Sequence, residues 1–175
     1  MINRCAREEG VAVTLNVPTA KFGIPRLRSE LAAFQSVLKR SGGAPDILVI
    51  MIDANAEGVA SRRRQIDAVL DRDVIPVSVC GVPDPYVERW LLADPVSFAE
   101  TFGHEPEGGR VRTRKEWKAR LVKALERGGQ IVTQGGAEFA EEIVSAMDLY
   151  RAGRIAPSLN AFISDLRTTL RTLGV

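Results

Sequence analysis

The sequence lacks the features that would assign it to a class at once. Among its 175 residues there are two cysteines, Cys5 and Cys80, whose spacing fits neither a zinc motif nor a disulfide framework, so a cytoplasmic location is expected. No run reaches the ~18 consecutive apolar residues of a membrane span, and residues 1–10 contain no apolar signal core. GxGxxG, Walker A, CxxC and HExxH motifs are absent. No membrane partner is therefore expected.

An excess of charge of one sign is lacking as well. The 24 basic residues face 22 acidic ones, and the net charge of +2 gives by itself no case for nucleic-acid binding. Hydrophobic residues make up 45% of the chain and charged residues 26%, which is typical of a globular protein. A chain of this length can bury a core without disulfides or metals.

What the sequence does contain is an alternation of strand-like and helical patterns. Residues 11–17 (VAVTLNV), 47–53 (ILVIMID) and 74–80 (VIPVSVC) are predicted to be strands of one parallel sheet. The second run is apolar throughout its length and contains neither proline nor glycine, so we expect it to be the central strand, covered on both faces. The fold class is therefore predicted to be α/β.

Helical periodicity accounts for most of the remaining chain. Helices are predicted over 25–40, 56–72, 83–94, 113–127, 137–151 and 158–173. Strands alternate with helices up to residue 100, and the pattern is helical afterwards. We therefore predict an α/β part (1–100) and a helical extension (101–175) that packs on the same core.

The second predicted strand ends in polar residues that could carry chemistry. Asp53 and Asn55 follow its apolar residues, and ligands of open α/β sheets bind beyond the carboxyl ends of the strands. A carboxylate and an amide oxygen are hard ligands that suit Mg²⁺ or Ca²⁺. The same pair is also typical of an Asx turn or a helix cap. Both interpretations stay open, and they are compatible with each other.

Three arginines, Arg62, Arg63 and Arg64, follow within the next predicted helix. They fan around the helix, so at most two of them can face the Asp53 loop. One interpretation is a solvated helix face. The other is a phosphate clamp, because the forked guanidinium group matches phosphate oxygens.

The segment PDPYVERWLLAD (83–94) contributes further acids. Val87, Trp90 and Leu91 are predicted to form the buried face of a short helix, with Glu88 at an adjacent angle. An acid in the first turn of a helix is favoured by the helix dipole whatever its function.

Two later segments also allow two interpretations. The basic segment RVRTRKEWKAR (110–120) could follow a nucleic-acid backbone, although Trp117 is in register with Leu121 and Leu125 and is predicted to belong to the core. The segment QGGAEFAEE (134–142) is compatible with an anion site at a helix start or with a plain turn.

The order of these motifs resembles that of the Toprim-like proteins. In particular, the sequence is similar to a bacterial family with a Glu-x-Trp-Leu-Leu-Ala-Asp segment, here ERWLLAD (88–94). The Toprim fold is that of the catalytic domains of topoisomerases, primases and the overcoming-lysogenisation-defect nucleases. The resemblance covers residues 1–100 and implies a small parallel Toprim-like sheet with a helical C-terminal extension.

The resemblance also implies roles for individual residues. Asp53 and Asn55 correspond to the metal pair of the fold and would bind Mg²⁺, with Asp53 and Glu88 as catalytic residues. Glu88 and Asp94 correspond to the acidic motif of the family. Arg62 and Arg63 would contact the substrate phosphate, as the phosphate-clamp interpretation has it.

The implied function is Mg²⁺-dependent, nuclease-like cleavage of phosphodiester bonds, in the setting of phage defence, with nucleic acid as the partner. The alternative is a non-catalytic Toprim-like binding or regulatory subunit that acts with an ATPase partner. A homo-oligomer is compatible with both.

One element of the Toprim pattern has no counterpart here. The pattern opens with a strand that bears a catalytic glutamate, whereas residues 1–10 resemble the end of a helix that Gly10 closes. We therefore expect the first strand of the fold to be missing and the isolated chain to be a poor enzyme until another segment or chain supplies the acid.

Overall fold

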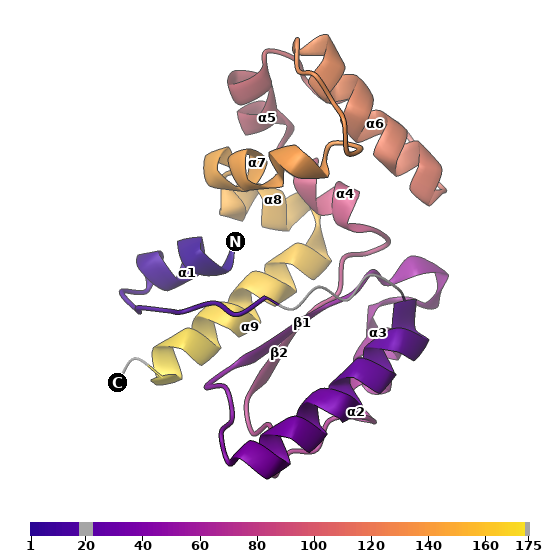
Figure 1. Cartoon of the computed structure of the whole chain (residues 1–175). Helices are drawn as coiled ribbons and strands as arrows, with labels where there is room; N and C mark the ends of the chain where they lie inside the picture. Colours follow the sequence, from indigo (N-terminus) through magenta and orange to yellow (C-terminus); the bar gives the residue numbers. More distant parts are fainter. Residues whose placement is uncertain (18–22, 174–175) are drawn as a thin grey trace. The chain divides into compact units, whose positions relative to one another are not determined.

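The computed structural model describes residues 1–17 and 23–173, which form two compact units (Figure 1). The sheet unit consists of Ile2–Val82 together with the chain from Phe162 onward, and the helical unit consists of Pro83–Ala161 with Met1. The predicted mixed α/β class is confirmed. The boundary expected near residue 100 lies inside a helix of the helical unit.

The sheet is small and parallel. Strands β1 (Leu48–Met51) and β2 (Ser78–Gly81) pair in register, with Leu48 opposite Ser78 and Met51 opposite Gly81. Two predicted strands are thus confirmed. The prediction that the first of them is central and covered on both faces is wrong, because the sheet has two strands within the described residues and Met51 is 47% exposed.

Residues 11–17 do not form a strand, so the third strand prediction is wrong. Their alternating pattern gives a local preference for extended backbone. A strand also needs a neighbour that satisfies its amide and carbonyl groups, and no described strand pairs with this segment. Leu15 and Val17 are accordingly exposed.

Helices cover the sheet. Figure 1 shows α2 (Gly23–Ser41) and α3 (Val59–Asp67) on one side of it and α9 (Pro157–Leu173) on the other. The core between α2, α3 and the sheet consists of Leu31, Ile50, Ile66, Leu70 and Ile75. The predicted helix over 56–72 is shorter, because a 3₁₀ turn (Asn55–Glu57) precedes α3 and Gly58, with φ of 79°, separates the two.

Ion pairs join the first helix of the chain to the last one. Helix α1 (Ile2–Glu8) ends before Gly10, whose φ of 71° confirms the predicted helix end. Arg167 on α9 binds Glu8, and Arg171 binds Glu9 at 2.6 Å. These contacts lie within the sheet unit.

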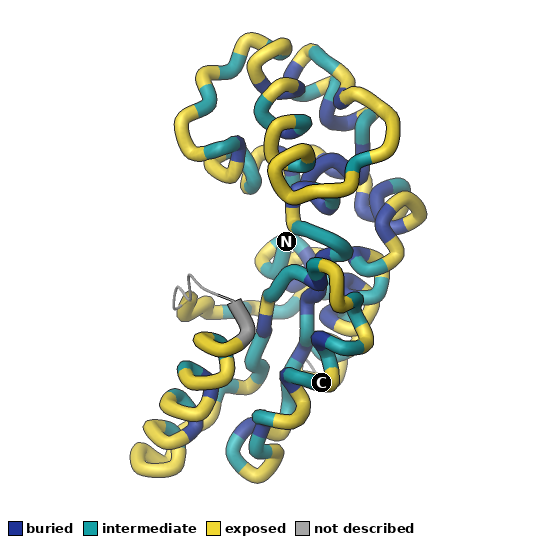
Figure 2. Tube along the Cα trace, turned by 90° about the vertical axis from the view of Figure 1, so that its right-hand side faces the viewer, coloured by how far each residue is buried: buried dark blue, intermediate teal, exposed yellow. Residues whose placement is uncertain are grey.

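The helical unit is built from short helices. They are α4 (Val87–Leu91), α5 (Pro95–Phe102), α6 (Arg114–Arg127), a 3₁₀ turn (Ala137–Phe139), α7 (Ala140–Ala146), α8 (Leu149–Ile155) and the first residues of α9. Figure 2 shows buried and exposed residues alternating along these helices. No described helix is long and apolar enough to cross a membrane.

The single helix predicted over 137–151 is interrupted. Met147 has ψ of 133°, which ends α7, and Asp148 then caps α8 by accepting hydrogen bonds from the backbone N–H groups of Tyr150 and Arg151. The break changes the helical phase. Tyr150, which an unbroken helix would place on the same face as the buried Ile143 and Met147, is 77% exposed.

Candidate functional site

The loop after β1 makes a tight turn at Asn55. This residue has φ of 53°, in the left-handed region that asparagine tolerates better than most residues. Its side-chain amide lies 3.4 Å from the carbonyl oxygen of Asp53. Asn55 therefore lies at a turn, and the Asx turn itself stays a prediction. The capping interpretation is wrong, because no side chain caps α3 at Gly58 or the 3₁₀ turn at Ala54.

The side chain of Arg62 stabilises this loop. The side chain is buried, and its Nε donates to the carbonyl oxygen of Asp53 at 3.2 Å. Its Nη1 lies 3.1 Å from a carboxylate oxygen of Glu57 and 3.0 Å from Oε1 of Gln65. Gln65 also donates to Glu57. Arg62 is thus neither on a solvated face nor in an open phosphate clamp, since the loop itself uses its guanidinium group.

Arg63 engages another part of the sheet unit. Its Nη2 donates to Asp165 of α9 at 2.8 Å, beside a cavity of about 320 Å³ that Arg72 and Ser78 also line. Arg72 is itself paired with Asp67 at 2.8 Å. The two predicted phosphate ligands, Arg62 and Arg63, therefore have different partners.

Asp53 and Asn55 lie in one loop, as predicted, and can each supply one oxygen ligand. The second acid of the loop, Glu57, is paired with Arg62. Within the described residues no group of three or more His, Cys, Asp or Glu side chains could hold a metal ion. The loop therefore fits Mg²⁺ only where waters and substrate oxygens complete the coordination, which is the usual arrangement for this ion.

Glu88 is buried in the helical unit. Its residue is 5% exposed, and its Oε2 is a buried oxygen without a hydrogen-bond partner among the described residues. Val87, predicted to face the core, is 37% exposed, so that prediction is wrong. Trp90 and Leu91 are buried as predicted, and Trp90 Nε1 donates to Ser158 Oγ at 2.9 Å. Burying a carboxylate oxygen without a donor is costly.

Asp53 and Glu88 belong to different units. The resemblance assigns both residues to one catalytic site, and that assignment stays a prediction.

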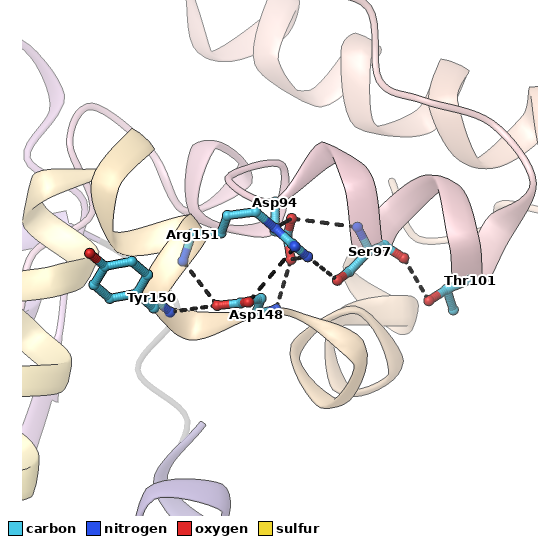
Figure 3. A network of polar contacts seen from close by, with 6 residues as sticks. All are labelled: Asp94, Ser97, Thr101, Asp148, Tyr150 and Arg151. Atoms are coloured by element: carbon cyan, nitrogen blue, oxygen red, sulfur yellow. Dashed lines mark hydrogen bonds and ion pairs between the residues drawn. The ribbon is translucent and has the colours of Figure 1, made fainter.

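Asp94, the last residue of the ERWLLAD segment, has a structural role. Its carboxylate caps α5 through the Ser97 N–H at 3.4 Å and accepts the Asp148 N–H at 2.7 Å. Figure 3 shows the fork of Arg151 on the same carboxylate, with Nε at 2.8 Å and Nη2 at 3.1 Å. Burial by itself would raise the pKa of Asp94, but the hydrogen bonds from Arg151 and Ser97 outweigh it and hold the pKa at about 2.

The basic segment forms α6 and the turn before it. A capping box of Thr113 and Glu116 starts this helix, and Leu121 and Leu125 are buried as predicted. Trp117 is only half-buried, so its assignment to the core is only partly right. The Arg120 guanidinium lies 5.5 Å from the centroid of its ring.

The glycine-rich segment at 134–142 forms a turn in which the Glu138 carboxylate accepts the backbone N–H groups. Glu138 Oε1 accepts the backbone N–H groups of Thr133 at 2.6 Å and Gln134 at 2.8 Å. The hydrogen bond from Gln134 is the main cause that holds the pKa of Glu138 at about 2. The backbone donors that could bind an external anion are therefore already used.

Comparison of the chain with protein-family models, with curated proteins and with solved structures finds no match. The relation to the Toprim-like proteins is thus a resemblance carried by the ERWLLAD segment and by the Asp53–Asn55 pair.

Proposed function

We propose that this chain is a Toprim-like protein that acts on phosphodiester bonds with Mg²⁺, in the manner of a nuclease. The observation that carries the proposal is the buried Glu88 carboxylate, whose Oε2 has no donor in the described structure. Such a group persists where a proton, a cation or a substrate completes it. The turn at Asp53 and Asn55 provides supporting evidence, because it follows the carboxyl end of β1.

Each residue has a distinct part in this proposal. Asp53 supplies a carboxylate ligand and Asn55 an amide oxygen, and a bound Mg²⁺ would stabilise the charge that builds on the phosphoryl oxygens. Glu88 takes or gives the proton at the attacking or leaving oxygen. Arg62 keeps the loop in shape. Arg63 reaches a substrate phosphate once it releases Asp165. The resemblance suggests phage defence as the setting.

A nuclease assay on the isolated chain tests the proposal, with Mg²⁺ and Mn²⁺ and with single- and double-stranded substrates. We expect weak cleavage, because Asp53 is the one carboxylate of the predicted metal pair and the glutamate of the Toprim pattern has no counterpart here. Positioned proton transfer is worth about 10²–10⁴-fold in rate. Asp53→Ala and Glu88→Gln should remove the residual activity, whereas Glu100→Gln, at an exposed acid of α5, should not. Cleavage that survives Asp53→Ala would overturn the assignment.

A second function, that of a non-catalytic regulatory subunit with an ATPase partner, is favoured by the contacts of the loop. Glu57 is committed to Arg62, and the Arg62 guanidinium places a positive charge beside the Asp53 carbonyl. In that case Mg²⁺ should not raise the melting temperature of the chain. Asp53→Ala and Glu88→Gln should then leave the effect on the ATP hydrolysis of the partner unchanged.

A further inference from the structure

A second cavity, of about 230 Å³, lies wholly within the helical unit. Its apolar walls are Leu92, Pro95, Pro106, Trp117 and Ile155. Cavities for drug-sized ligands measure about 300–1,000 Å³. The smaller volume here suits a single ring system.

Trp117 gives this cavity an aromatic wall with an unused donor. Its indole Nε1 is buried and has no hydrogen-bond acceptor among the described residues, although buried tryptophans usually find one. Arg120 is placed over the ring and donates to the carbonyl oxygens of Gly108 and Gly109 at 3.2 and 3.1 Å. The guanidinium group of Arg120 thus contacts both Trp117 and the loop at Gly108 and Gly109.

The lining of the cavity carries charges of both signs, and backbone carbonyl oxygens engage its two arginines. Arg89 donates to those of Asp84 and Ile155, and Arg120 donates to those of Gly108 and Gly109. Glu105 and Glu107 both belong to the lining. Glu107 is neutralised by Lys123 at 2.7 Å and Arg127 at 2.6 Å. Glu105 is exposed and offers an acceptor for an amino group. With two glutamates and two arginines in the lining, the charges do not select an anion. The apolar walls and the Trp117 ring favour an uncharged ring with donor and acceptor groups.

Basic residues flank the start of α6, and we call them the basic rim. Its exposed cations are Arg110, Arg112, Arg114, Lys115 and Lys118. The one acid of this stretch, Glu116, is used by the capping box, where it accepts the backbone N–H groups of Arg112 and Thr113. The rim thus offers a positive surface that suits a phosphate backbone.

We propose that this cavity receives one base of a single-stranded nucleic acid, packed against Trp117, while the basic rim contacts the neighbouring phosphates. The inference rests on the proposed function, from which it takes that the ligand is a nucleic acid. It adds that the ligand is single-stranded. A base paired within a duplex cannot enter the cavity unless it leaves the stack. Aromatic stacking beside a basic groove is the usual means of binding single strands.

Fluorescence anisotropy with the full chain in EDTA tests the proposal, since without metal ions binding is separated from cleavage. The probes are a labelled single strand of about 12 nucleotides, an abasic strand of equal length, and the matching duplex. We expect the base-bearing single strand to bind more tightly than the other two. Equal affinity for the base-bearing and abasic strands would overturn the proposal.

Variants locate the binding site. Trp117→Ala should weaken binding of the base-bearing strand by about 5- to 150-fold and leave the abasic strand unchanged. Trp117→Phe keeps a ring and loses the N–H, so we expect a loss of about 2- to 10-fold. The double variant Lys115→Ala, Lys118→Ala should bind both the base-bearing and the abasic strand more weakly. Arg40→Ala, at an exposed cation of the sheet unit, is the charge control and should change neither.

Circular dichroism shows whether each variant folds. Should Trp117→Ala fail to fold, Trp117→Phe and the abasic strand still decide the question. An unchanged affinity of Trp117→Phe, together with equal affinity for the base-bearing and abasic strands, would refute the assignment of the base to this cavity. Base-dependent binding by a chain that does not cleave would instead count against the nuclease proposal and leave the cavity assignment standing.

Discussion

Two aspartates of the chain differ in how the structure uses them. Asp94 is 2% exposed, and its carboxylate accepts hydrogen bonds from Arg151 and from two backbone N–H groups (Figure 3). Asp53 is half-buried, and its backbone carbonyl receives the hydrogen bonds from Arg62 and Asn55. The difference shows that an acid within a motif is assigned a role by its partners rather than by its spacing.

The largest effect on stability is expected from Asp94→Ala. Removal of a buried carboxylate that is paired with an arginine costs about 3–5 kcal/mol, and the partial exposure of Arg151 points to about 3 kcal/mol. Urea unfolding would measure it. Asp148→Ala, which removes a helix cap, is the matched control and should cost about 1 kcal/mol. A loss below that of Asp148→Ala would refute the structural role of Asp94.

Arg62→Ala should have an intermediate effect. It leaves Glu57 and the Asp53 carbonyl without their buried donor, which we expect to cost about 2 kcal/mol. Arg64→Ala, at an exposed position of the same helix, should change the free energy of unfolding by about 0.5 kcal/mol or less. Hydrogen exchange of the loop amides should increase in the first variant alone. Equal effects of both variants would show that Arg62 does not brace the loop.

The decrease in the free energy of unfolding at acidic pH should depend on Asp94. Its pKa is about 2 in the folded chain, below the unfolded value of about 3.9. A lowered pKa contributes stability above the unfolded value, and this contribution is lost as the pH falls from about 5 toward 2. Chemical unfolding across this range should show a steeper decline for the wild type than for Asp94→Asn. Parallel curves would contradict the prediction.

A smaller effect on stability than that of Asp94→Ala is expected from Asp53→Ala. Alanine retains the backbone carbonyl that Arg62 and Asn55 contact, and Asp53 is half-buried rather than fully buried. Any rise in melting temperature that Mg²⁺ causes in the wild type should disappear in the variant. A destabilisation as large as that of Asp94→Ala would place Asp53 among the structural acids.

Local patterns predicted several elements correctly. Both strands follow from their apolar runs, and α2, α6 and α9 follow from helical periodicity. The failed strand at 11–17 has the same local signal as a true strand, and pairing depends on a partner that the pattern does not contain.

The side-chain environment was predicted less well, because it depends on distant contacts. Trp90, in the same short helix as the buried Glu88, donates to Ser158, which lies 68 residues away. Arg151, which neutralises Asp94, lies 57 residues from it. Helical spacing carries no sign of either contact.

The bracing of the Asp53 loop by Arg62 has a consequence for binding affinity. The conformational entropy of this loop is reduced when the chain folds, because Gln65, Glu57 and Arg62 hold it before any ligand arrives. A ligand at Asp53 would therefore meet a preorganised loop and retain more of its contact energy as affinity. The binding entropy should be less unfavourable for the wild type than for Arg62→Ala.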